Sequence, residues 1–315
     1  MATRFEFVIH GERESALRAA GEEAVAEIHR IEAELSVFRP DSQIARLNRE
    51  AGQSPVRLSP EIFDLLHHAT QLSQATGGAF DVTVGPLLQA WGLRDSQGRL
   101  PSAEEIAQAH ECVGAHRIRF DPENRLVQFH RPGVALDLGG IGKGYALDRA
   151  AELLREAGVS SALLHGGTST VVAIGNPPDA EAWKVAIDRP APMIRPPNAP
   201  EAPPTPTVPL AIVALRDESL SVSAVWGRGF EINGIFYGHV MDPRIGRPVT
   251  GAWLAALVLP SATESDALST ALLVDGKTFQ ESLRRHLPQA RSLIVQPASF
   301  PPGFEVFSNG ISAST

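Results

Sequence analysis

The feature that most constrains this chain is a glycine-rich turn at 139–144, placed between a short apolar run and an amphipathic helix. The apolar run at 134–138 predicts a buried strand, and the glycines predict a bend where the backbone approaches something closely. From Lys143 onward, apolar residues recur at helical spacing, which predicts a helix. Gly158 stands where a helix is expected to end in a cap residue of left-handed backbone conformation. A strand is predicted next at 161–165, before a second glycine pair. The segment therefore predicts a β-α-β unit with two turns stripped of side chains, an arrangement that favours a bound ligand.

The turn matches neither of two common phosphate-binding motifs. A Walker loop requires Ser or Thr after its Gly-Lys pair, but Gly144 follows Lys143. The dinucleotide-binding fingerprint requires an acidic residue at the end of the next strand, where His165 stands. On these residues alone, a structural turn and a ligand-binding turn both remain open.

The composition is that of an ordinary globular protein, with 43% hydrophobic and 20% charged residues in a chain of 315. A net charge of -8 argues against a general affinity for nucleic acid or anionic membranes. The single cysteine, Cys112, excludes an intramolecular disulfide and a thiolate metal cluster. No secretory signal and no membrane span is visible, so we expect a cytoplasmic protein, or a periplasmic one if the N-terminus has been trimmed.

Helices and short strands are predicted along most of the chain. Residues 3–10 alternate as a half-buried strand should, and apolar residues between 17 and 35 follow one face of a long helix. Ser42 is placed to cap a short helix after the turn at Pro40. Further elements are predicted as follows: helices over 60–76 and after Ser102, a hairpin of 117–120 with 126–130, strands at 183–187, 210–215 and 253–259, and a hairpin over 230–237.

A proline-rich stretch at 189–209 interrupts the second half of the chain. It contains few apolar residues, so we expect a surface loop without a fold of its own. The strands predicted on either side indicate an insertion within one fold, and no internal repeat or other boundary is visible. The sequence therefore predicts a single domain over 1–315.

A carboxylate and a hydroxyl share one face of a late helix. Thr263 is predicted to cap this helix and Gly276 to end it, which places Asp266 and Thr270 one turn apart. A small site made only of oxygen ligands suits magnesium better than zinc or copper. In the alternative interpretation, Asp266 is a capping residue and Thr270 bonds back to its own helix.

Two further polar residues have a structural and a functional interpretation. Asp81 lies between apolar neighbours in the glycine-flanked segment 77–85, and an isolated Asp in such a place is often a turn or cap residue. His239 stands after the hairpin marked by Asn233 and Gly234, where it is either a hydrogen-bonded structural residue or a catalyst.

Together these segments resemble the ApbE family, the FAD:protein FMN transferases. The matching blocks occur in the family's order and extend over nearly the whole chain. They are 38–42 with Asn48, 78–86 with 91–92, 137–145, 166–167, 238–244 and 265–270, and the opening 1–3 is similar to the start of the family's domain.

The resemblance implies a single compact α/β fold with mixed sheets and an FAD cleft between two β-containing halves. It implies that FAD is the bound substrate, that Mg²⁺ bridges its diphosphate, and that FMN passes to a Thr or Ser hydroxyl of an acceptor protein while AMP leaves. The metal ligands implied are Asp266, Thr270 and the Gly140 carbonyl, and the candidate base is His239. The FAD site implied consists of Met1, Phe38, Ala79, Phe80, Asp81, Asp137, Lys143 and Val240.

The chain departs from the family's pattern at several places. Thr168 follows the second glycine pair where Asp is frequent, and 223–226 replaces an expected Thr-Ser-Gly. The insertion at 189–209 is unusual, and the family's lipoprotein signal is not visible. Two alternatives to the transferase therefore stay open: an FAD pyrophosphatase that gives FMN and AMP, and a non-catalytic FAD-binding protein.

Overall fold

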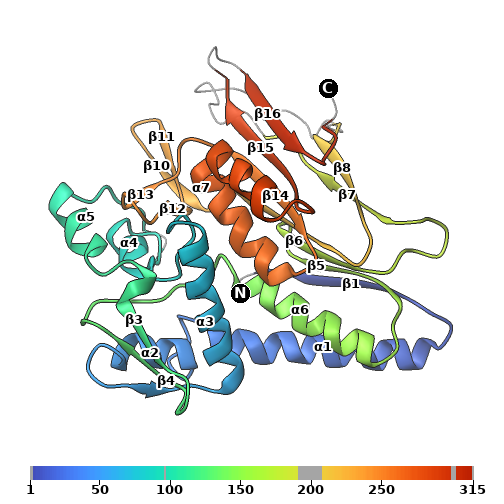
Figure 1. Cartoon of the computed structure of the whole chain (residues 1–315), viewed down its shortest axis with the longest axis horizontal. Helices are drawn as coiled ribbons and strands as arrows, with labels where there is room; N and C mark the ends of the chain where they lie inside the picture. The colour runs from blue at the N-terminus through green and yellow to red at the C-terminus, as the bar shows by residue number, and fades with distance from the viewer. Residues whose placement is uncertain (1–2, 96, 191–207, 299–302, 314–315) are drawn as a thin grey trace.

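A central antiparallel sheet organises the structure, a computed structural model that describes residues 3–95, 97–190, 208–298 and 303–313 (Figure 1). Within these ranges the sheet has seven strands. Strands β6 and β14 lie inside it and are buried at every residue, as expected where both faces of a sheet are covered. The order across the sheet is β1 (Phe5–His10), β5 (Ser161–Gly166), β6 (Thr170–Ile174), β9 (Ser219–Ala224), β14 (Leu254–Leu259), β15 (Arg291–Pro297) and β16 (Phe304–Asn309).

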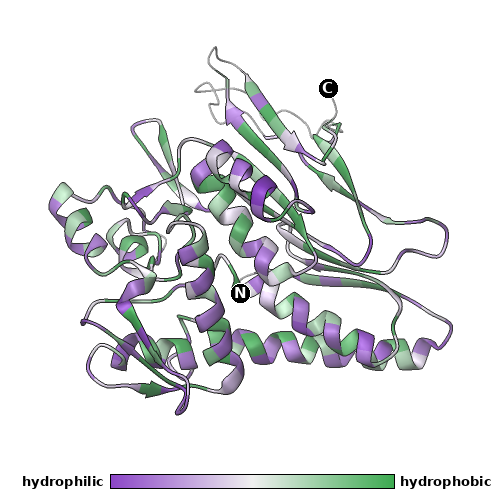
Figure 2. Ribbon diagram, in the orientation of Figure 1, coloured by the Kyte–Doolittle hydropathy of each residue, from purple (hydrophilic) through white to green (hydrophobic). Residues whose placement is uncertain are grey.

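Helices cover one face of the central sheet. Helix α7 (Ala262–His286) packs on β9 and β14, α6 (Gly142–Glu156) packs on β5, β6 and α7, and α1 (Glu14–Leu35) lies against α6. Figure 2 shows polar and apolar residues alternating along α1, as expected of a helix with one buried face. Because the starts of α6 and α7 meet, any residue near either start lies close to the other helix.

A hairpin covers the opposite face of the sheet. It consists of β7 (Trp183–Ile187) and β8 (Ala211–Leu215), which pair antiparallel and share a hydrophobic cluster with β5, β6, β14 and β15. The proline-rich stretch predicted as a surface loop connects these two paired strands, and most of it lies outside the described residues.

The second half of the molecule contains the shorter elements. Helix α3 contacts α7 and so joins this half to the first. The elements are α2 (Gln43–Glu50), α3 (Pro60–Ala75), α4 (Gly85–Ala90), α5 (Ala103–His110), the 3-10 helix η1 (Ala115–Arg117), the three-stranded sheet β2 (Val56–Arg57), β4 (Leu126–Phe129) and β3 (Ile118–Asp121), and the hairpins β10 (Gly229–Ile232) with β11 (Ile235–Gly238) and β12 (Met241–Asp242) with β13 (Arg247–Pro248).

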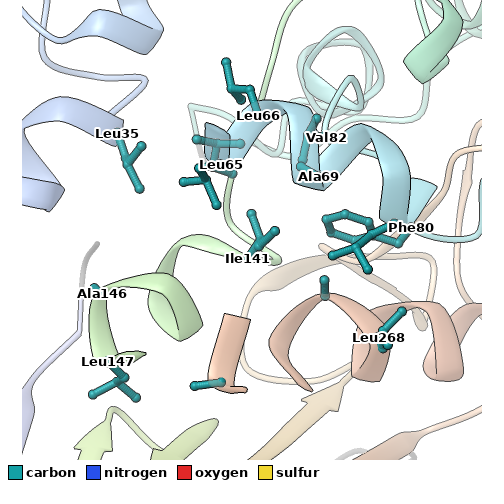
Figure 3. Packing of buried hydrophobic residues seen from close by; sticks show 14 of the residues in the cluster. Leu35, Leu65, Leu66, Ala69, Phe80, Val82, Ile141, Ala146, Leu147 and Leu268 are labelled. Atoms are coloured by element: carbon teal, nitrogen blue, oxygen red, sulfur yellow. The ribbon is translucent and has the colours of Figure 1, made fainter. Parts of the chain in front are cut away.

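One hydrophobic core extends through both halves. Leu66 of α3, Ile141 before α6, Leu268 of α7 and Phe80 belong to the same buried cluster, and Figure 3 shows Ile141 and Phe80 in the space between α3 and the helices below it. The mixed architecture of helices and sheets predicted from the sequence is confirmed. None of the helices in the described ranges is long and apolar enough to cross a membrane.

The strand predicted at 134–138 is wrong, and with it the β-α-β unit. This segment forms no strand and belongs to no sheet. The Asn48 amide brackets Leu136, since Leu136 N donates to Asn48 Oδ1 at 2.7 Å and Asn48 Nδ2 donates to Leu136 O at 3.0 Å. Asp137 N donates to the Val82 carbonyl at 2.8 Å. A side chain and a loop therefore satisfy backbone groups that a neighbouring strand would otherwise pair.

The late helix begins earlier and ends later than the sequence predicts. Ser261, not Thr263, caps α7 and accepts a hydrogen bond from Glu264 N, while the Thr263 hydroxyl donates to Asp148 at 2.7 Å. Gly276 has a left-handed φ of 57° and kinks the helix, which then continues to His286. The glycine marks a break in the helix, but the sequence does not reveal that a second segment follows.

Candidate functional site

A cavity of about 1200 Å³ opens between the two halves. Loops and element ends from both halves line it, including the end of α1, the 139–143 turn, the end of β9, the start of β10 and the α7 face. Every predicted site residue that the structure describes lies on its wall; Met1 lies outside the described residues. The residues are Phe38, Ala79, Phe80, Asp81, Asp137, Gly140, Lys143, His239, Val240, Asp266 and Thr270.

Asp266 lies where α6 meets α7, and its side chain is only 5% exposed. Lys143 Nζ lies 3.2 Å from Oδ1 and 3.4 Å from Oδ2. The backbone amide of Gly144 donates to Oδ2 at 3.1 Å, and the Thr170 hydroxyl donates to Oδ1 at 3.4 Å. The carboxylate is thus held by one cation and by two neutral donors, one of which belongs to the first turn of α6.

Gly144 makes this contact between the helices possible. A Cβ atom at this position would lie 2.0 Å from the Ala262 carbonyl oxygen and 2.9 Å from Asp266 Cβ, and both distances are impossible for real atoms. The glycine therefore lets the start of α6 approach α7 until its amide reaches the carboxylate. Ser or Thr at this position, as a Walker loop requires, would separate the two helices.

Thr270 lies one turn further along α7, beside the glycine turn. Its hydroxyl donates to the Asp266 backbone carbonyl at 3.2 Å and lies 3.4 Å from Ser223 Oγ. A Cβ on Gly140 would lie 3.3 Å from Thr270 Oγ1. The bond back to its own helix is thus present, and the hydroxyl also faces the backbone of the predicted third ligand.

The oxygen atoms at this corner fit a small hard cation. The described residues contain no group of three or more His, Cys, Asp or Glu side chains that could hold a metal ion. A single carboxylate with a hydroxyl and a carbonyl nearby is the kind of incomplete site that Mg²⁺ uses when substrate phosphates supply further ligands. The donor set of Asp266, Thr270 and Gly140 therefore fits Mg²⁺ in the presence of a diphosphate.

Asp81 has the structural role that the sequence left open, although it also lies on the cavity wall. Its carboxylate accepts hydrogen bonds from Ser73 Oγ at 2.8 Å, Ala115 N at 2.8 Å, and Thr83 N and Oγ1 at 2.8 and 2.6 Å. Because four donors already hold it, Asp81 fixes the loop that carries Phe80.

Two other predicted residues shape the cavity through their loops. The side chain of Phe38 is 67% exposed, in a loop where Ser36 Oγ accepts from Phe38 N at 3.2 Å. Asp137 Oδ1 accepts from Gly139 N at 2.9 Å, which closes a tight turn just before the glycine pair. A large exposed aromatic ring at a cavity wall is available for stacking on a planar ligand.

His239 follows the β10–β11 hairpin. Its Nδ1 lies 3.1 Å from the Arg228 carbonyl oxygen, which can only accept, so Nδ1 carries the proton and Nε2 keeps its lone pair. Burial lowers the pKa of His239 below its ordinary value of 6.5, so the ring is neutral at pH 7. The hairpin is anchored by stacking of Phe230 on Tyr237 at 5.3 Å.

Sequence reasoning missed several residues in and behind the cavity wall. Thr170, which is fully buried and contacts Asp266 directly, was not identified, and neither was Arg228, whose carbonyl orients His239. Trp226 and Ser223, noted only as departures from the family's pattern, both line the cavity. For Ser223 the sequence does contain a signal. Serines alternate at 219, 221 and 223, a pattern that places three hydroxyls on one face of a strand.

The comparisons with known proteins agree with this geometry. The model of the ApbE family matches residues 1–294. An FAD:protein FMN transferase of Klebsiella pneumoniae is 28% identical over 301 residues, covering 94% of this chain and 82% of that protein. The FAD:protein FMN transferase of Escherichia coli K12 is 30% identical over 257 residues, covering 80% and 70%.

Solved structures give the same result at the level of the fold. The crystal structure of the ApbE protein of Thermotoga maritima has a TM-score of 0.83 to this chain and 27% sequence identity, and the match covers 98% of this chain and 94% of that one. The flavinyl transferase ApbE of Pseudomonas stutzeri, in its apo form, has a TM-score of 0.79 and 27% identity, covering 97% and 90%. With a family model matched over nearly its whole length and an ApbE fold, this chain belongs to the ApbE family.

Proposed function

We propose that this protein is an FAD:protein FMN transferase that uses Mg²⁺. The observation that carries the proposal is the corner of the cavity where Lys143, the Gly144 amide and the Asp266 carboxylate meet, beside Thr270 and Gly140. A positive charge and hard oxygen ligands for a divalent cation are the groups needed around a diphosphate, and the Gly144 amide holds the carboxylate ligand in place. The names of the relatives, FAD:protein FMN transferase, support the same reaction.

The reaction transfers the FMN phosphoryl group from AMP to the hydroxyl of the acceptor protein. The acceptor hydroxyl oxygen attacks the phosphorus of the FMN half, the bond from that phosphorus to the AMP oxygen breaks, and AMP leaves with the bonding electrons. Bound Mg²⁺, held by Asp266, Thr270 and the Gly140 carbonyl, would neutralise phosphate charge. Lys143 supplies a second positive charge at the same place, and the cavity walls hold flavin and acceptor in line.

His239 is proposed to accept the proton of the acceptor hydroxyl. The Arg228 carbonyl fixes the tautomer in which Nε2 has a free lone pair. Since burial keeps the pKa of His239 low, the ring is neutral and ready to accept a proton at pH 7. Protonation is opposed most by burial and also by the charges of Arg228 and Lys143.

A mass-spectrometric experiment tests the proposal. Incubation of the protein with FAD, Mg²⁺ and a set of Thr- and Ser-containing peptides should give AMP and a peptide heavier by FMN minus water. The Asp266→Asn variant should lose roughly 100-fold or more of this rate, because one charged ligand is removed from the reacting centre, but should still bind FAD. Asp179→Asn, an exposed aspartate away from the cavity, is the matched control. An Asp266→Asn enzyme with unchanged turnover would refute the metal assignment.

A second candidate function is FAD pyrophosphatase, in which water attacks in place of the acceptor hydroxyl and FMN and AMP are released. The observation that favours it is Trp226, a large side chain on the cavity wall within the stretch that departs from the family's pattern. The same experiment separates the two functions. AMP with free FMN and no labelled peptide would identify the pyrophosphatase, and neither product with retained FAD binding would identify a non-catalytic binder.

A further inference from the structure

A line of buried hydroxyls leads from Asp266 into the packing between α7 and the central sheet. Thr170 of β6 and Ser221 of β9 face α7, where Ser265 precedes Asp266. Thr170 Oγ1 is 3.4 Å from Asp266 Oδ1, Ser221 Oγ is 3.2 Å from Thr170 Oγ1, and Ser265 Oγ is 3.0 Å from Ser221 Oγ. Three elements thus place their hydroxyls in one hydrogen-bonded row that ends on the carboxylate.

Counting protons gives this row a direction. A carboxylate only accepts, so the single hydroxyl proton of Thr170 is used on Asp266. Ser221 must then donate its own proton to Thr170. Ser265 Oγ lies next to Ser221 at 3.0 Å, but its hydroxyl also donates to the Ala262 carbonyl at 3.2 Å. The two hydroxyls nearest the carboxylate, those of Thr170 and Ser221, therefore both donate toward Asp266, an order in which successive hydrogen bonds polarise and strengthen one another.

The row lies in an environment where hydroxyls are costly. The exposed fractions of Thr170, Ser221 and Ser265 are 0%, 1% and 0%, and the helix packs there on the central sheet. Val and Ala would fill similar volumes between α7 and the sheet without any polar group to satisfy. The hydroxyls are therefore better explained by the carboxylate at the end of the row than by packing.

We propose that Thr170 is a positioning residue for the cation and diphosphate site, an inference that rests on the proposed function. Its hydroxyl, which accepts from Ser221, holds Oδ1 of Asp266 while the Gly144 amide holds Oδ2. Both of these donors are fixed by the fold. Lys143, on a flexible stem with 20% of its side chain exposed, is the exchangeable partner whose place on the carboxylate a divalent cation takes.

Binding of Mn²⁺, measured by electron paramagnetic resonance in the presence of FAD, tests this role without turnover. Thr170→Val keeps the branched shape and removes the hydroxyl, and it should weaken Mn²⁺ binding by roughly 10- to 100-fold, as loss of a group that orients a metal ligand does. Thr170→Ser restores the hydroxyl and should recover most of the affinity.

Ser292→Ala is the matched control. Ser292 is an equally buried serine of the central sheet, in β15, but its hydroxyl accepts from Gln280 Nε2 at 3.1 Å, apart from the row that ends on Asp266. Its loss should lower the urea midpoint while Mn²⁺ binding stays that of the wild type. The urea midpoint of each Thr170 variant shows whether the protein is folded when Mn²⁺ is added.

The outcomes separate this inference from the proposed function. Wild-type protein that binds Mn²⁺, with a folded Thr170→Val variant that binds it equally well, would overturn the positioning role alone. Equal loss in Thr170→Val and Ser292→Ala would overturn it too, because a general packing defect would then explain both. Wild-type protein that binds no Mn²⁺ with FAD would overturn the metal site and this inference together.

Discussion

At the scale of single residues, the site depends on how each titratable group is held. The imidazole of His239 is oriented by one carbonyl and kept neutral by burial, and Lys143 is paired with a buried carboxylate. The acid-base behaviour of the enzyme should therefore be set mainly by the pKa of His239.

The pH dependence of the rate follows from the direction of that shift. Because the pKa of His239 lies below 6.5, the neutral base persists as the pH falls to 6.5 and is lost only at lower pH. We expect kcat/KM for the acceptor to be level above pH 7 with respect to this group and to fall on an acid limb with a midpoint below 6.5.

The His239→Gln variant checks the assignment of that limb. It should lose roughly 100- to 10,000-fold in rate, as removal of a general base does, and its remaining rate should lack the acid limb. The measurement is a pH–rate profile of both proteins at saturating Mg²⁺. A variant that keeps the limb unchanged would show that another group titrates there.

A residue of the site could be predicted from the sequence where its side chain differs in chemistry from the residues around it. Asp266, Thr270 and Lys143 stand out because polar groups in glycine-rich or apolar surroundings are unusual, and all three line the cavity. Thr170 could not be identified in this way, since threonine is ordinary in a strand. Its contact with Asp266 joins residues 96 positions apart in the chain, and only the fold brings them together.

At the scale of elements, the junction of α6 and α7 is the part on which the site depends most. Its geometry requires a glycine in the first turn of a helix, against helix propensity. The long amphipathic helices were predictable because their period is strong, as in α1 and α6. The conformation of 134–138 was not predictable, because an apolar run does not show which groups its backbone will bond to. Here the partner is the side chain of Asn48.

Substitution of Gly144 by Ala tests the junction. Propensity alone would make Ala more favourable in a helix by about 1 kcal/mol, but its Cβ would overlap the Ala262 carbonyl oxygen. We expect the free energy of unfolding to fall by about 1–3 kcal/mol or more, measured by urea unfolding. Transfer activity should fall as well, because Asp266 is displaced.

Gly251→Ala is the matched control for this substitution. A Cβ at Gly251 would meet nothing within 4 Å, and the residue is exposed. Its midpoint should therefore stay close to that of the wild type. A Gly144→Ala protein as stable and as active as Gly251→Ala would mean that the two helices are not held as closely as described.

At the scale of the whole molecule, the cavity lies between two halves that share one core. A ligand seated there contacts the end of α1 and the 79–81 loop on one side and the sheet and α7 on the other. Since a ligand that binds only the folded state stabilises it, bound FAD should stabilise the protein as one unit. The overall class was predictable from the order of the motifs, whereas the strand order of the central sheet was not, because it depends on pairings between distant segments.

Thermal unfolding with and without ligand measures this effect. FAD at about 100-fold above its Kd should add about 2.7 kcal/mol to the free energy of unfolding and so raise Tm by several degrees, with a further increase on adding Mg²⁺. Riboflavin, which lacks the diphosphate, is the control and should gain nothing from Mg²⁺. An Mg²⁺ increment as large with riboflavin as with FAD would place the metal away from the diphosphate.

The pairing of Lys143 with Asp266 has a consequence for the resting enzyme. A buried negative charge without a counter-ion would work against folding, but here the protein supplies its own positive charge before any substrate arrives. Under the proposed function, entry of metal and diphosphate would exchange one positive partner for another, and the freed ammonium would turn to the incoming anion. The resting protein can thus keep its reactive corner assembled and electrically balanced between turnovers.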